Sequence, residues 1–154
     1  MSNSKKEAKH NFRPIIGIAL VSLLACGLLY PLLITGLAQV LFPYQSNGEI
    51  AVHNGQRVGS YLISQNFTLP IFFHPRPIND SASGVDPDIT MQDAYNQIPR
   101  IQRALNSTSI TNDTLRQLVN ENTEGTYWIF GTPYVDVLRL NLALINRYPD
   151  KYLK

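Results

Sequence analysis

Two groups of ionisable side chains in this sequence have types that could bind a metal ion. Asp86 and Asp88 flank Pro87, and alternating carboxylates are typical of a calcium loop. The group lacks the length and the glycine of such a loop, so it fits better as turn residues before a helix. His53 and His74 lack the close pairing of a zinc site. We therefore expect no metal site, and no catalytic residue, since the phosphate-loop and nucleophile-elbow motifs are also absent.

Polar residues and a proline interrupt a long apolar run. No charged residue occurs from Pro14 to Gly48, yet the second half holds Pro31, Thr35 and Gln39. Pro31 removes a backbone donor and predicts a local bend, whereas Thr35 and Gln39 can hydrogen-bond a neighbouring helix. A plain anchor needs none of them. We expect these residues to form an interface with another membrane subunit, together with a face of small residues. The expected interface residues are Ser22, Ala25 and Cys26 on the small-residue face, with Pro31, Thr35 and Gln39.

The apolar run is long enough to cross a membrane. The 28 residues from Ile15 to Phe42 would form a helix of about 42 Å, whereas the hydrocarbon core needs about 20 residues. A cleavable signal peptide has an apolar stretch of only about 7–15 residues. The lipoprotein-like sequence ending at Cys26 continues into more apolar residues instead of a polar tether. We therefore expect one uncleaved transmembrane helix over residues 14–42.

The charge is distributed unevenly on the two sides of this helix. Residues 1–13 carry four basic residues and one acidic residue, whereas residues 43–154 hold nine basic and ten acidic residues. The positive-inside rule places the basic tail, 1–13, in the cytoplasm and residues 43–154 outside the cell membrane. The outer part has no basic patch of the kind that nucleic acid requires. Cys26 is the only cysteine, so the outer part cannot contain a disulfide.

The outer part reads as a small α+β domain. Pro43–Gly48 is rich in turn formers, and Asn54-Gly55 joins two alternating segments, 49–53 and 57–64, into a hairpin. Capping patterns predict helices from Thr90 to about Leu105, over residues 113–122 with Asn112 or Thr111 as the cap, and after Asp136. The last of these also shows a strand-like alternation. Residues 127–130 predict a further strand.

A series of short blocks occurs in a fixed order over about residues 25–145. These blocks are Tyr30-Pro-Leu, Thr35, Ala38-Gln, Phe42-Pro, Gln45–Gly48, Val58–Phe67, Phe72-Phe, Arg76-Pro, Ser83–Ile89, Thr123-Glu, Gly131-Thr-Pro and Val135–Leu144. Together they resemble the KdpC family, the C subunit of the Kdp potassium-transporting ATPase. Two residues differ from the family's usual ones, Ser64 for glycine and Asp88 for histidine. Only residues 78–82 remain of the long Gly/Ser/Asn-rich insertion that the family commonly carries.

The resemblance implies a non-catalytic accessory subunit in a complex that hydrolyses ATP to import K⁺. Its partners would be a channel-like subunit that carries the ion and a P-type pump subunit that is phosphorylated. No cofactor would be bound firmly, and ATP would be reached through the complex. The family is described as a chaperone for ATP binding, and Gly59, Ser60 and Gln65 could supply donors to phosphate. Alternatively, they are structural: a hairpin strand in which Gly59 permits close backbone approach, outside the membrane and away from ATP.

A different function also fits the sequence. An anchored ligand-binding module could use an aromatic surface formed by Phe72, Phe73, Tyr127 and Trp128. A buried core role fits the same side chains better than a binding surface does.

Overall fold

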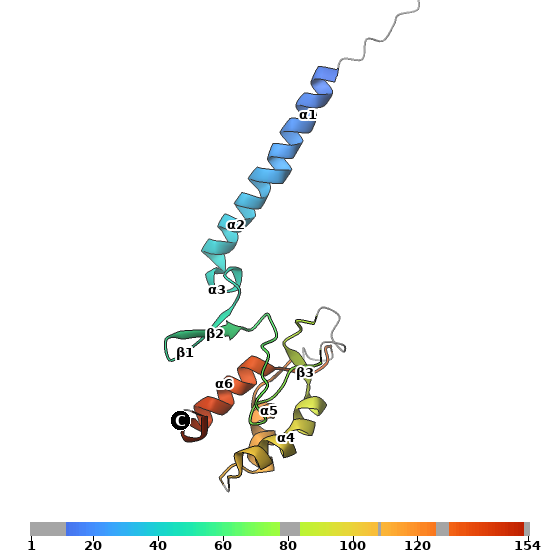
Figure 1. Ribbon diagram of the computed structural model, residues 1–154. Coiled ribbons are helices and arrows are strands. Elements are labelled where there is room, and N and C mark those ends of the chain that lie inside the picture. Colours follow the sequence, from blue (N-terminus) through green and yellow to red (C-terminus); the bar gives the residue numbers. More distant parts are fainter. Residues whose placement is uncertain (1–11, 78–83, 108, 126–129, 153–154) are drawn as a thin grey trace, which may run out of the picture. The chain divides into compact units, whose positions relative to one another are not determined.

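The structure, a computed structural model, describes residues 12–77, 84–107, 109–125 and 130–152. The chain divides into two compact units, Met1–Asn47 and Gly48–Lys154. The N-terminal unit contains one long helix, Phe12–Leu41, which is apolar and long enough to cross a membrane. It consists of α1 (Phe12–Leu24), a π-helical segment η1 (Ala25–Leu29) and α2 (Tyr30–Leu41) (Figure 1).

The irregularity predicted from Pro31 takes the form of the π-helical segment η1. The N–H of Tyr30 bonds the carbonyl of Ala25, five residues back, immediately before the proline. Pro31 has no N–H to offer the carbonyl of Gly27 and crowds it, and a wider turn accommodates both effects. After α2, the predicted turn linker is instead one short helix, α3 (Pro43–Ser46), with Pro43 in its first turn.

A hairpin opens the C-terminal unit, as predicted. Strand β1 (Ile50–His53) pairs antiparallel with β2 (Gln56–Ser60), and the turn residues Asn54 and Gly55 have φ of 50° and 77°. Both positive values are what a type I′ turn requires. The predicted second strand is too long, because the chain turns at Ser60. Its hydroxyl donates to the carbonyl of Gly48 at 2.6 Å and accepts from the N–H of Leu62 at 3.2 Å.

Three short strands form a second sheet that the sequence patterns do not predict. Strands β3 (Asp88–Thr90), β4 (Thr123–Glu124) and β5 (Tyr134–Asp136) are antiparallel in the order β3-β5-β4. Asp88 therefore lies in a strand rather than in a turn before a helix. Of the strand predicted over 127–130, only Phe130 is described, as an isolated bridge residue, and 127–129 lie outside the described residues.

Helices begin at the predicted caps. Thr90 caps α4 (Met91–Leu105), which continues past Pro99, and Thr111 caps α5 (Asn112–Glu121). Asp136 caps α6 (Val137–Arg147), so the segment after Asp136 is a helix and not a strand. A short α7 (Pro149–Tyr152) follows.

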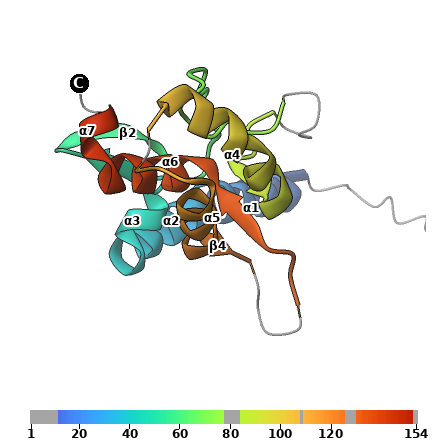
Figure 2. The same cartoon turned by 90° about the horizontal axis from the view of Figure 1, so that it is seen from below.

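In the C-terminal unit, helices α4, α5 and α6 pack with the three-stranded sheet around one core. Helix α4 contacts β3 and β5, α6 contacts β5, and α5 contacts both α4 and α6 (Figures 1 and 2). Fully buried side chains come from all of these elements and from the extended segment before β3, among them Phe73, Ile89, Ile101, Leu115, Val135 and Leu140. The predicted architecture, one long apolar helix followed by a small domain of helices and strands, is confirmed.

Candidate functional site

Residues 73–77 form a segment without a strand partner that follows a turn at residues 69–72, and side-chain amides bind it to the core. Asn141 of α6 is fully buried, accepts from the N–H of Phe73 at 2.8 Å and donates to its carbonyl at 2.9 Å. A single side chain thus satisfies both backbone groups of Phe73, as a neighbouring strand would.

Helix α4 holds the next residue in the same way. Gln97 accepts from the N–H of His74 at 2.7 Å and donates to its carbonyl at 3.1 Å. Arg100 adds hydrogen bonds to the carbonyls of Pro70, at 2.8 Å, and Phe72, at 2.9 Å. We call the two amide pairs, Asn141–Phe73 and Gln97–His74, the amide clamps. Together they fix the position of Pro75, Arg76 and Pro77, which follow directly.

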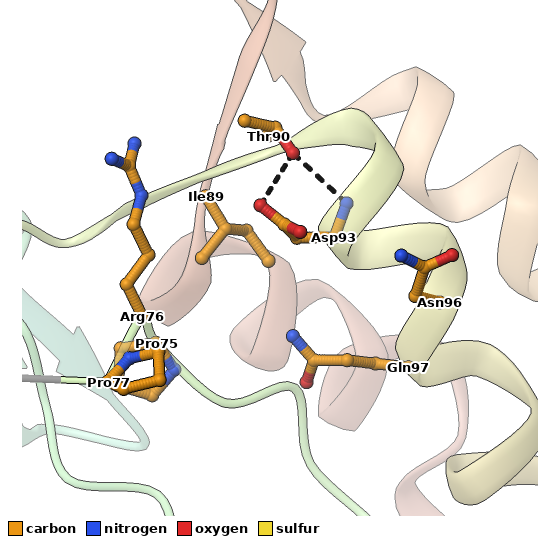
Figure 3. A pocket seen from close by; sticks show the side chains of 8 residues that line it. All are labelled: Pro75, Arg76, Pro77, Ile89, Thr90, Asp93, Asn96 and Gln97. Atoms are coloured by element: carbon orange, nitrogen blue, oxygen red, sulfur yellow. Dashed lines mark hydrogen bonds between the residues drawn. The ribbon is translucent and has the colours of Figure 1, made fainter. Parts of the chain in front are cut away.

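Two hollows adjoin Arg76. The first, of about 410 Å³, lies between the Pro75–Pro77 segment and the start of α4, and Ile89 and Thr90 complete its lining. In Figure 3, Gln97 reaches from α4 toward the prolines, whereas the Arg76 side chain extends away from α4. Asp93, also in this hollow, is paired with Thr90. The second hollow, of about 380 Å³, adjoins the same segment and includes Ser64, Asn66 and His74.

A third hollow, of about 240 Å³, is acidic. Four carboxylates line it, from Glu49, Asp88, Glu124 and Asp136, together with the guanidinium of Arg139. Arg139 pairs with Glu124 and lies over the ring of Tyr61, 4.9 Å from its centroid. Asp88 and Asp136 are directly opposite each other on β3 and β5. Like charges in this arrangement repel, so the hollow stores an electrostatic cost.

Burial of Asp88, together with this repulsion, makes stability depend on pH. Burial, followed by the carboxylates of Asp136, Asp86 and Glu124, raises the pKa of Asp88 from 3.8 to about 6, while Arg76 opposes the shift. The folded chain therefore binds this proton at a pH at which the unfolded chain has released it. For this group, the free energy of unfolding should rise as pH falls from about 7.5 toward about 4.5.

The variant Asp88→Asn tests this expectation. It should be more stable than the wild type at about pH 7.5, and the difference should shrink toward about pH 4.5, as measured by urea unfolding. Asp113→Asn, on the exposed first turn of α5, is the matched control and should leave the pH dependence as it is. The same pH dependence in Asp88→Asn and wild type would contradict the assignment.

The three residues that the resemblance links to nucleotide lie together, and their polar groups have partners within the domain. A Cβ on Gly59 would lie 2.9 Å from Cδ of Gln65 and 3.0 Å from Cδ2 of Leu138. The hydroxyl of Ser60 is bound to backbone groups, and the amide of Gln65 donates to the carbonyl of Ile63 at 2.9 Å. This arrangement supports the structural alternative, in which Gly59 permits close packing against α6.

The predicted interface residues lie along the apolar helix. Pro31, Thr35 and Gln39 are spaced by four and share one face of α2, whereas Ser22 lies on α1 and Ala25 and Cys26 lie in η1. Ala25 is half-buried and the others are exposed. Gln39 also has a local partner, because its carbonyl oxygen accepts from the side-chain amide of Asn47 at 3.2 Å.

Other sequence-based candidates are also located. In the described part of the chain, no group of three or more His, Cys, Asp or Glu side chains is arranged to hold a metal ion. Phe73 is fully buried, and Phe72 packs between Phe67 and Tyr152, at centroid distances of 5.5 and 5.3 Å. Phe73 therefore belongs to the buried core, whereas Phe72 is partly buried between these two rings. Tyr127 and Trp128 lie outside the described residues.

Comparison with known families gives a match over most of the chain. The sequence matches the family model for KdpC, the c chain of the K⁺-transporting ATPase, in two segments, residues 12–80 and 78–146. The chain belongs to the KdpC family. The two segments meet at residues 78–80, where the sequence lacks the insertion described above.

Curated KdpC subunits are similar along nearly their whole length. The potassium-transporting ATPase KdpC subunit of Koribacter versatilis is 34% identical over 190 residues, covering 92% of this chain and 97% of the relative. The KdpC subunit of Gloeobacter violaceus is 36% identical, covering 79% and 88%, and that of Bacillus cereus is 34% identical, covering 85% and 93%. The alignment of 190 residues exceeds the 154 of this chain, so the first relative carries additional residues.

The sequence patterns do not predict a role for the two residues that position Arg76. Asn141 lies within the matching block Val135–Leu144, and Gln97 lies in no matching block. One signal was present, because Asn141 falls among leucines on the apolar face of α6. A buried amide on such a face is expected to bond main-chain groups.

Proposed function

We propose that this KdpC chain is a membrane-anchored accessory subunit that stabilises the assembly of an ATP-driven potassium importer. The observation that carries the proposal is the helix Phe12–Leu41, none of whose described side chains is fully buried within the chain. An apolar surface of this length requires lipid or other membrane subunits around it. The family match supplies the complex to which those subunits belong.

The proposal includes an orientation and partners. The basic tail lies in the cytoplasm and the C-terminal unit outside the cell membrane, which the charge difference between residues 1–13 and 43–154 supports. The partners are the channel-like subunit and the P-type pump subunit. In this position the C-terminal unit could also shield the outer ion entrance of the complex.

The chain contributes to transport without a reaction of its own, because the phosphorylated pump subunit performs ATP hydrolysis. A chaperone role that raises the ATP affinity of the pump stays a prediction from the family resemblance. The internal hydrogen bonds of Ser60 and Gln65 favour a structural function for those residues. Labelling of a cysteine introduced at Gln65 from outside intact cells would weigh against nucleotide contact.

Deletion of the chain tests the proposed function. Without it, the channel-like and pump subunits should no longer co-purify as a stable complex, and cells should fail to grow at micromolar K⁺. Re-expression of the full chain should restore both. Normal growth and an intact complex after deletion would refute the proposal.

The polar residues of α2 give a more specific prediction. Replacing Thr35 and Gln39 together by leucine should leave membrane insertion intact, because leucine is more apolar, but reduce the co-purification of the partners several-fold, on the order of the roughly 1 kcal/mol that such interhelical bonds contribute.

Asn47→Ala provides the control, since it removes the local partner of Gln39 and a hydrogen bond to the carbonyl of Pro43 but leaves Gln39 itself in place. If Asn47→Ala weakens assembly as much as the leucine pair, the local bond and not a subunit interface explains the effect. Intact assembly of the leucine variant would reduce this segment to a plain anchor.

A further inference from the structure

Arg76 has hydrogen-bonding capacity that the domain does not use. Its Nη2 lies 3.6 Å from Oδ2 of Asp86, longer than the roughly 2.7–2.9 Å of a charge-assisted hydrogen bond. Its Nε is buried and has no hydrogen-bond partner among the described residues. A buried donor without an acceptor is costly, and a guanidinium has five donors arranged to bind a carboxylate in a bidentate way. The side chain is one-third exposed, so a group from outside can reach it.

The backbone presents Arg76 in a fixed position. The amide clamps hold Phe73 and His74 immediately before it, and Pro75 and Pro77 restrict φ on both sides. Preorganisation of this kind lowers the entropy lost when a ligand is bound. A guanidinium needed only for an internal ion pair on a surface would contribute little to stability and would not require such support.

The surroundings of Arg76 have room for a small polar group. It lines both the hollow of about 410 Å³ and the hollow of about 380 Å³. In the second of these, the described lining includes Ser64, Asn66 and His74 and no carboxylate. A hydroxyl and an amide beside a guanidinium are the groups that recognise a carboxylate.

The charges nearby distinguish between the anions that could bind. Asp86 and Asp88 lie close enough for their charges and that of Arg76 to affect one another. A phosphate carries up to two negative charges and a nucleotide more, and one arginine cannot offset these beside two aspartates. A single carboxylate carries one charge and matches the fork of the guanidinium.

We propose that Arg76 is a docking point for an Asp or Glu side chain of another subunit in the complex. On binding, the incoming carboxylate accepts hydrogen bonds from the Nη atoms of the guanidinium, which Asp86 engages only loosely. This inference rests on the proposed function, because it requires an assembled complex, and it adds the chemistry of one contact.

Two variants separate this role from an internal one. Arg76→Gln removes the guanidinium and should reduce co-purification of the partner subunits by about tenfold or more, the equivalent of one charged hydrogen-bonded contact. Asp86→Asn removes the internal carboxylate but keeps the oxygen that accepts from the N–H of Asp88. It should assemble at least as well as the wild type, because Arg76 is then fully available.

Arg103→Gln, at an exposed position of α4, is the matched control and should assemble normally. Thermal unfolding of each purified full-length variant monitors folding. Equal loss of assembly in Arg76→Gln and Asp86→Asn would overturn the inference in favour of an internal ion pair, as would normal assembly of Arg76→Gln. The proposed function is judged separately, from the wild-type chain. If the wild-type chain co-purifies with the partner subunits, the proposed function stands whatever the variants do, and if it does not, the proposed function is refuted.

Discussion

Replacing Asn141 by leucine should destabilise the C-terminal unit by about 2–5 kcal/mol, because two buried backbone groups lose their partner at once. The amide of Asn141 satisfies both the N–H and the carbonyl of Phe73, and its side chain is fully buried. Leucine has the same branched shape and the same number of side-chain heavy atoms as asparagine and leaves no cavity, so the loss is dominated by the unpaired groups. Urea unfolding of the full chain in detergent, followed by near-ultraviolet circular dichroism, measures the change.

The control lies on the same helix. Asn146 is exposed, and Asn146→Leu should change the free energy of unfolding by no more than about 0.5 kcal/mol. If the two leucine variants have the same stability, the pairing of Asn141 with Phe73 does not contribute as described. A large effect of Asn141→Leu would also displace Arg76, and assembly should fall with it.

Replacing Phe73 by alanine should cost about 3–5 kcal/mol, for a different reason. The ring is fully buried in the core among residues from the sheet and the helices. Since Asn141 bonds the main chain, Phe73→Ala keeps both hydrogen bonds and removes only the side chain. The loss therefore combines apolar burial with the cavity that remains.

Two comparisons define the result for Phe73. Phe73→Leu keeps most of the volume and should cost less than about 1.5 kcal/mol. Phe130 is 71% exposed, and Phe130→Ala should have little effect on the same urea unfolding curve. A loss of under about 1 kcal/mol in Phe73→Ala would show that the core is centred elsewhere.

Local signals in the sequence predicted the elements that depend on neighbouring residues. Asn54-Gly55 defines its own turn, and Thr90 and Asp136 cap helices through the backbone N–H three residues later. These interactions span only a few residues, so pattern alone finds them. The apolar run Phe12–Leu41 is recognised for the same reason, since length and hydropathy are local properties.

The second sheet and the surroundings of Arg76 depend on distant contacts. Strands β3, β4 and β5 have three residues or fewer, which is too short for an alternation to be recognised. The clamp between Phe73 and Asn141 joins residues 68 positions apart. The side chain of Asn141 bonds the backbone N–H and carbonyl of Phe73. Nearly every residue carries these two groups, so side-chain types do not reveal which residue is the partner. The resemblance identified Arg76-Pro77 as a motif, but only the structure shows the unsatisfied Nε.

Relatives of this chain can differ in length after Pro77 at little cost to folding. The amide clamps hold the chain before this point, and the pairing of β3 with β5 holds it again from Asp88. Closing a longer loop between two fixed ends costs only about 0.6 kcal/mol for each doubling of its length. An evolving protein could therefore gain or lose many residues between Pro77 and Asp88 while the helices of the domain stay unchanged. The same tolerance makes this junction a suitable place to insert an epitope or a fluorescent reporter into the folded subunit.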